Sequence, residues 1–211
     1  MREKRVVEYY LLCTKLKDLI RTGWKDWKVK RERIESVAEH IFGTQMLAIS
    51  MYSEFEYDID IYKVVFMLAL HELEETIIGD LTHFQITKEQ KKKIGHDAVE
   101  KICSKLLSGE AIKNLIFEFD EEETPEAIFA HWCDKLEFDL QSKIYSDEGC
   151  VDVFDQDDNS TSKDDKVQSL LSECPEFGYM ILKYGQERYG YDKNFKAVSD
   201  YALTHKMNKK G

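Results

Sequence analysis

The ten residues from His71 to Asp80, HELEETIIGD, constrain the fold more than any other part of the chain. They follow an apolar run, Val64 to Leu70, which we expect to be a buried helix segment. Burying this run carries a histidine and several carboxylates into the protein, where charges need partners. His71 and Glu75 are four residues apart and Glu72 and Glu75 three apart, so that on a helix they form one cluster. Such a cluster indicates a metal site or acid–base chemistry.

The remaining sequence predicts an all-α protein with a single domain over residues 1–211. This length fits one domain, and only 2 prolines and 10 glycines interrupt the helical periodicity. Ser36 to Glu39 and Thr87 to Gln90 have the pattern of capping boxes, and Thr124-Pro125 is typical of a helix start. The expected helices cover about residues 3–20, 36–55, 61–78, 87–107, 110–121 and 124–145, with C-terminal helices within 175–207 and a mobile acidic loop at 147–165.

Charge and cysteine content narrow the class of protein. The net charge of −11 argues against a nucleic-acid partner, because binding a phosphate backbone calls for a basic face. A phosphate-bearing small molecule stays compatible with this balance, since local Arg, Lys or metal charge can outweigh it. The five cysteines include no CxxC pair, which favours free thiols in a reducing compartment. We find neither a signal-peptide pattern nor an apolar run of membrane-spanning length, so we expect a cytoplasmic protein without a membrane partner.

Two further residues are candidates to join His71 and Glu72. His40 lies in the first turn of the second expected helix, and Asp134 lies in the helix that starts at Pro125. Two imidazoles and two carboxylates form a ligand set for a divalent transition metal that leaves positions open for water. Sequence spacing does not bring His40 or Asp134 to the cluster, so tertiary packing has to do so. Taken singly, a helix histidine is more often a hydrogen-bonded core residue than a ligand.

Four sequence elements resemble one known family. SVAEH at 36–40, HELEETIIGD at 71–80 and CDKLE at 133–137, preceded by RTGW at 21–24, match the HD-domain metal-dependent phosphohydrolases in order and approximate spacing. The resemblance is greatest to their 5′-deoxynucleotidase branch and covers about residues 10–145. It implies an HD-type helical bundle with one divalent metal ion (Mn, Co, Zn or Fe). It also implies a homodimer that hydrolyses nucleoside 5′-monophosphates, above all deoxynucleotides, to nucleoside and phosphate.

The resemblance implies a ligand set with one departure. His40, His71 and Asp134 match the family's metal ligands, and Glu72 stands where the family has the aspartate of its His-Asp pair. The extra methylene moves the carboxylate outward, and metal geometry tolerates little misplacement. Two alternatives therefore stay open. Beside the expected phosphomonoesterase, the first is an HD-type hydrolase of another nucleotide phosphoester. The second is a non-catalytic nucleotide-binding protein whose metal site has decayed and whose Glu72 lies on the surface.

The resemblance also implies roles in the reaction. Glu75 would orient or deprotonate the attacking water, and Asp80 would contact the sugar or help with proton transfer. Arg21 would grip the phosphate, because its planar fork donates two hydrogen bonds, and Trp24 would pack near the deoxyribose.

Four other polar residues are expected to have no part in the site. His131 is interpreted as a boundary residue and His83 as an exposed loop histidine. His96 is expected to face solvent on a lysine-rich helix. Glu74 is expected to point to solvent or to a buried arginine.

Overall fold

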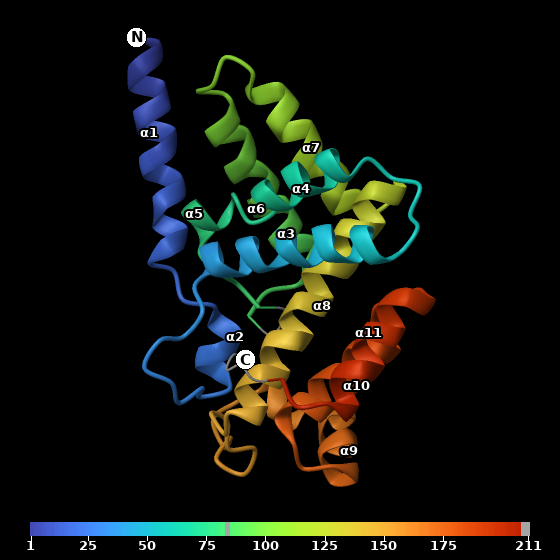
Figure 1. Cartoon of the computed structure of the whole chain (residues 1–211). Helices are drawn as coiled ribbons and strands as arrows, with labels where there is room; N and C mark the ends of the chain where they lie inside the picture. The colour runs from blue at the N-terminus through green and yellow to red at the C-terminus, as the bar shows by residue number, and fades with distance from the viewer. Residues whose placement is uncertain (83–84, 208–211) are drawn as a thin grey trace. The chain divides into compact units, whose positions relative to one another are not determined.

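The computed structural model describes residues 1–82 and 85–207, and over these residues the chain is helical (Figure 1). One isolated bridge between Ile20 and Ser36 is the sole β-type pairing within the described residues, so the all-α prediction is confirmed. The chain forms two compact units, residues 1–22 with 35–131 and residues 23–34 with 132–211. His83 lies outside the described residues.

The first unit contains the helices on which most of the candidate residues lie. Both predicted capping boxes are confirmed, since the Ser36 and Thr87 hydroxyls accept from the backbone N–H groups of Glu39 and Gln90. A buried hydrophobic cluster in this unit consists of Leu70, Leu73, Val99, Ile102, Cys103 and Ile116. Its elements are α1 (Arg2–Thr14), η1 (Lys15–Lys17), α3 (Val37–Glu54), α4 (Ile61–Leu70), α5 (Glu75–Ile78), α6 (Lys88–Cys103), α7 (Gly109–Glu121) and the start of α8 (Pro125–Asp147).

The continuous helix predicted for 61–78 is wrong. Helix α4 ends at Leu70, and residues 71–74 form a tight turn before α5 begins at Glu75. The backbone N–H groups of Leu73, Glu75 and Thr76 each donate to the carbonyl three residues back instead of four, which winds the chain more tightly. His71 and Glu72 therefore lie on a turn between two helices rather than on one helix face.

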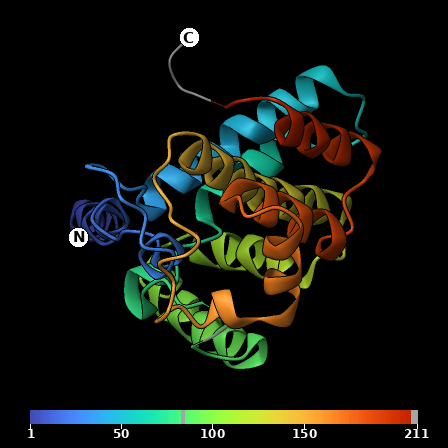
Figure 2. The same ribbon diagram turned by 90° about the horizontal axis from the view of Figure 1, so that it is seen from below.

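The second unit is built around α10 (Phe177–Arg188), which packs against α9 (Asp165–Glu173) and α11 (Lys193–Thr204) (Figure 2). Trp24 and Trp27, from α2 (Thr22–Asp26) and its C-terminal end, belong to its core, together with Tyr145 of α8 and Phe177. The sequence predicted the C-terminal helices but not α2 or α9.

The acidic segment 147–165 has more local structure than its composition predicted. It contains the short helix η2 (Thr161–Lys163), and three of its polar side chains are buried. The Ser162 hydroxyl donates to the carbonyls of Gln156 and Asn159, and the Asn159 amide donates to Gln156 Oε1. These bonds satisfy polar groups that burial removes from water.

The sequence also led to expectations about the cysteines and about membrane-spanning segments. All five cysteines are free thiols, as predicted. Within the described residues, no helix combines the length and the apolar character needed to cross a membrane.

Candidate metal centre and surrounding charges

The turn at 71–74 is fixed in the first unit by the apolar residues on either side of it. Leu70 and Leu73 are buried in the core, so the two residues between them are held at its edge. Only 3% of the surface of His71 and 9% of that of Glu72 are exposed. A histidine and a carboxylate buried at this level need polar partners.

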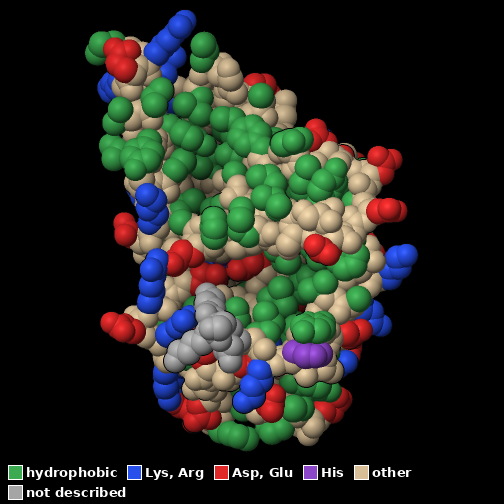
Figure 3. All heavy atoms as spheres, in the orientation of Figure 1, with side chains coloured by type: hydrophobic (Ala, Val, Ile, Leu, Met, Phe, Trp, Pro, Cys, Tyr) green, Lys and Arg blue, Asp and Glu red, His purple; other side chains and the backbone are tan. Residues whose placement is uncertain are grey.

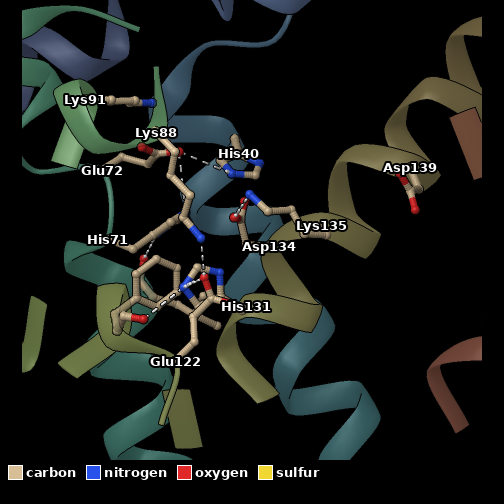
Figure 4. Close-up of polar contacts among 12 residues, drawn as sticks. His40, His71, Glu72, Lys88, Lys91, Glu122, His131, Asp134, Lys135 and Asp139 are labelled. Carbon is tan, nitrogen blue, oxygen red and sulfur yellow. Dashed lines mark hydrogen bonds and ion pairs between the residues drawn. The ribbon is translucent and has the colours of Figure 1, made fainter. Parts of the chain in front are cut away.

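His40, His71 and Glu72 converge within the first unit (Figure 4). Glu72 Oε1 lies 3.8 Å from His40 Nε2 and 3.7 Å from His71 Nε2. The two imidazole rings are 5.4 Å apart between centroids, and one ligand atom from each of the three residues lies within 4.8 Å of the others. The expected tertiary packing thus brings His40 to the turn.

The orientation of His71 suits a metal ligand. Its Nδ1 lies 2.8 Å from the carbonyl oxygen of Leu68, and because a carbonyl only accepts, Nδ1 carries the proton. The lone pair of the neutral ring is then on Nε2, the atom that faces Glu72. Metal-binding histidines commonly have this arrangement, in which a hydrogen bond to the other nitrogen fixes the ring. Two imidazoles and one carboxylate are also donors that transition metals accept, so these residues fit a divalent ion.

Glu72 is not a surface residue, contrary to the interpretation of a decayed site. Its longer side chain brings Oε1 between the two imidazoles, and Arg21 Nη1 donates to the same oxygen at 3.1 Å. The extra methylene therefore leaves the carboxylate within reach of the histidines. Arg21, the predicted phosphate ligand, lies at this oxygen and is itself mostly buried.

Glu75 lies one turn further on and is enclosed. Its side chain has no exposed surface, and Lys91 Nζ donates to its Oε1 at 3.4 Å. Burial, with the nearby charges of Glu72 and Asp80, raises the pKa of Glu75 to about 11. A buried carboxyl group with a raised pKa next to a candidate metal centre is typical of groups that handle protons.

Asp80 connects this cluster to the segment that carries Arg21. Its Oδ2 accepts from the backbone N–H of Thr22 at 2.6 Å, and the Thr22 hydroxyl donates to the Asp80 carbonyl at 2.8 Å. The two bonds hold the chain after Gly79 against the residue that follows Arg21.

The expectation that Glu74 points to solvent or to an arginine is wrong. Its Oε2 is buried and, among the described residues, has no hydrogen-bond partner. Its side chain packs against α6 at Gly95, where an added Cβ would come within 3.3 Å of Glu74 Cγ. Burial, followed by the charge of Glu72, raises the pKa of Glu74 to about 8.

Two predicted site residues belong to the second unit. Asp134 is buried on α8, and Lys135 donates to its Oδ2 at 2.8 Å. Trp24 is fully buried, with its ring stacked on Phe138 at 4.7 Å and edge-on to Tyr145 at 5.1 Å. Because its ring has no exposed surface, the predicted contact of Trp24 with a sugar is corrected to a packing role in the core of this unit.

Comparison with known families agrees with this geometry. Residues 13–174 match the family described as HD domain, which is most of the chain. This chain belongs to the HD-domain family. A 5′-deoxynucleotidase HDDC2 of Dictyostelium discoideum is 34% identical over 147 residues, 66% of this chain and 76% of the relative. A 5′-deoxynucleotidase hdd1 of Schizosaccharomyces pombe is 29% identical over 66% of this chain and 72% of its own length. A human 5′-deoxynucleotidase HDDC2 is 28% identical over 68% and 70%.

Solved structures share the fold of this HD-domain protein. The PH0347 protein of Pyrococcus horikoshii has a TM-score of 0.67 and 23% identity, covering 94% of this chain and 98% of that one. A protein of Magnetospirillum magnetotacticum named "predicted metal-dependent phosphohydrolase" has a TM-score of 0.65 and 19% identity, covering 96% and 91%. At such identities the likeness concerns the fold alone.

Two further histidines of the HD-domain protein, His131 and His96, have structural partners. His131 stacks on Phe119, with ring centroids 3.9 Å apart, and agrees with the interpretation of a boundary residue. His96 does not simply face solvent, because it stacks on Phe117 at 3.8 Å and its Nε2 lies 2.8 Å from Asp120 Oδ2.

Proposed function

We propose that this HD-domain protein is a metal-dependent phosphomonoesterase that hydrolyses deoxynucleoside 5′-monophosphates to nucleoside and phosphate. The observation that carries the proposal is the buried convergence of two imidazoles on the Glu72 carboxylate, with Arg21 at the same oxygen. A metal ion held by these donors and the mostly buried Arg21 would each neutralise negative charge on a phosphate monoester. The names of the relatives support the choice of deoxynucleotides.

We propose that Asp134 completes the ligand set from the second unit. Support comes from its burial on α8 and from the match of CDKLE to the family. The family match over 13–174 also spans both units, which supports a single domain over 1–211. A divalent ion held by these donors supplies Lewis-acid polarisation of the phosphate and makes water more acidic.

The charged side chains around the ligands would bind the substrate and manage protons. The Arg21 guanidinium would bind phosphate oxygens, because its planar fork of N–H groups donates two parallel hydrogen bonds. The positive charge of a divalent ion at the neighbouring donors would lower the pKa of Glu75 again. As a carboxylate, Glu75 would then accept a proton from the attacking water. Asp80 keeps its proposed role toward the sugar or in proton transfer, while its Oδ2 holds Thr22.

A substrate panel tests the proposed function. Purified protein supplied with Mn²⁺, Co²⁺ or Zn²⁺ is expected to release inorganic phosphate from dAMP, dGMP, dCMP and dTMP, and faster than from the matching ribonucleotides. Cyclic nucleotides and nucleoside triphosphates in the same panel test the alternative, HD-type hydrolysis of another nucleotide phosphoester, because these substrates give different products. No phosphate from any monophosphate, under all three metals, would refute the proposal.

We also propose that the protein is a cytoplasmic homodimer. The five free cysteines support the cytoplasmic location.

An apolar surface of the first unit, the α3–α4 face, supports the dimer and is part of the hydrophobic surface in Figure 3. A groove of about 560 Å³ on it has no charged residue among its described lining, whereas the whole chain carries a charge of −11. In the proposed dimer two copies contact each other through this face, which brings no like charges together. The aromatic side chains of one copy would pack beside the groove of the other. The face comprises Phe42, Met46, Ile49, Tyr52, Tyr62 and Phe66.

A further inference from the structure

Helix α6 begins with a run of lysines that point to different partners. Lys88 Nζ contacts Glu122 Oε1 at 3.1 Å and Lys92 Nζ contacts Glu121 Oε1 at 2.8 Å, both at the end of α7. Lys91 instead reaches Glu75, with Nζ 3.4 Å from Oε1. This lysine alone among the three turns toward the candidate metal centre, because α6 packs on α5 at this point.

The surroundings of Lys91 are strongly acidic. The charges of Glu72, Glu75, Glu74 and Asp80 raise its pKa, although burial acts in the opposite direction. Arg21 is engaged by the Glu72 oxygen, so the two cations serve different carboxylates of the same cluster. Lys91 is also partly exposed, with 32% of its side-chain surface accessible, whereas Glu75 has none.

The contact leaves the two oxygens of Glu75 in different situations. Oε1 is held by Lys91, and Oε2 is buried without a hydrogen bond among the described residues. A carboxylate anchored through one oxygen keeps a fixed direction for the other, and catalytic groups need this precision of placement. The anchor is itself fixed, since Lys91 lies in the first turn of a helix that starts at a capping box.

We propose that Lys91 is a positioning residue, which holds Glu75 through Oε1 and directs Oε2 toward the reacting water. The proposal rests on the proposed function and adds a residue to it. The sequence does not distinguish Lys91 from the other lysines of this run, and only the packing of α6 on α5 separates it from them.

Steady-state kinetics on dAMP, with metal content measured for every variant, test the proposal. Lys91→Met is expected to lower kcat about 10- to 100-fold, the usual loss when a partner that orients a reactive group is removed. KM and metal content are expected to stay within about 2-fold of the wild type. Lys91→Arg, which keeps a cation able to reach Glu75, is expected to recover part of kcat. Lys93→Met, an exposed neighbour in the same run, serves as the matched control and is expected to behave as wild type.

Two kinetic results would overturn the proposal. An unchanged kcat in Lys91→Met shows that Glu75 needs no anchor. A raised KM with unchanged kcat shows that Lys91 binds the substrate phosphate instead.

Melting temperatures test the contact independently of activity. Lys91→Met is expected to lower the melting temperature, and to lower it less than half as much in a Glu75→Leu background, because the oxygen that accepts from Lys91 is already absent. Equal drops in both backgrounds refute the pairing. A wild type that releases no phosphate refutes the proposed function alone, since the melting experiment still decides whether Lys91 holds Glu75. If Lys91→Met does not fold, Lys91→Gln replaces it in both experiments.

Discussion

At the scale of single residues, the Glu72 carboxylate holds the candidate centre together. Its Oε1 lies within 4 Å of two imidazole nitrogens and of Arg21 Nη1. We expect Glu72→Gln to lower metal content and phosphate release by about 10- to 100-fold, because a neutral amide is a poorer ligand than a carboxylate. Metal analysis and a phosphate assay measure both, with the surface variant Glu121→Gln as control. Full metal occupancy and full activity in Glu72→Gln would contradict the role of this carboxylate.

Glu74 makes stability depend on pH. Burial raises its pKa from 4.5 to about 8. An acid with a raised pKa contributes its full stability below the unfolded pKa, and this contribution is lost as pH rises from about 4.5 through about 8. We therefore expect Glu74→Gln to gain unfolding free energy relative to wild type between pH 5 and pH 8, by about 2–4 kcal/mol. Urea titrations at both pH values, in one metal state, measure the difference. Parallel pH profiles of the two proteins would contradict the burial effect.

At the scale of elements, local sequence determined the helix starts but not the turn at the site. Ser36 and Thr87 cap their helices through side chains only three residues away, which is information that the sequence carries. Residues 71–74 have no glycine or proline, so nothing local distinguishes the turn from a continuing helix. The turn depends on how Leu70 and Leu73 pack in the core. Trp24 was misjudged and Lys91 was missed for the same reason, since burial and side-chain direction are set by tertiary packing.

The contact between α8 and α10 depends on the absence of a side chain at Gly185. A Cβ there would lie 2.1 Å from Asp139 Oδ2, and Asp139 is buried with Tyr191 donating to the same oxygen at 3.0 Å. We expect Gly185→Ala to lower the unfolding free energy by about 1–3 kcal/mol, as overpacking does. Glu187→Ala, on an exposed part of the same helix, is expected to change it by less than about 1 kcal/mol. Equal denaturation midpoints for Gly185→Ala and wild type would contradict the close approach.

At the scale of the whole molecule, the α3–α4 face determines the expected assembly. Phe66 is 53% exposed on it. We expect Phe66→Glu to convert a dimer into a monomer, because the charge would be buried in the interface without a partner. Sedimentation velocity measures the change. Phe154→Glu, 82% exposed in the second unit, is the control and is expected to leave the dimer intact. A wild type that sediments as a monomer would contradict the proposed assembly.

Metal dependence is the claim on which the function of the whole molecule rests. Its most direct test is the rate of phosphate release from dAMP before chelation, after removal of the metal by a chelator, and after addition of Mn²⁺ or Co²⁺. We expect removal to abolish at least about 99% of the rate and addition to restore it, because the donors at the centre would act on phosphate only through the ion. An undiminished rate in protein shown by elemental analysis to be free of metal would contradict a metal-dependent phosphohydrolase.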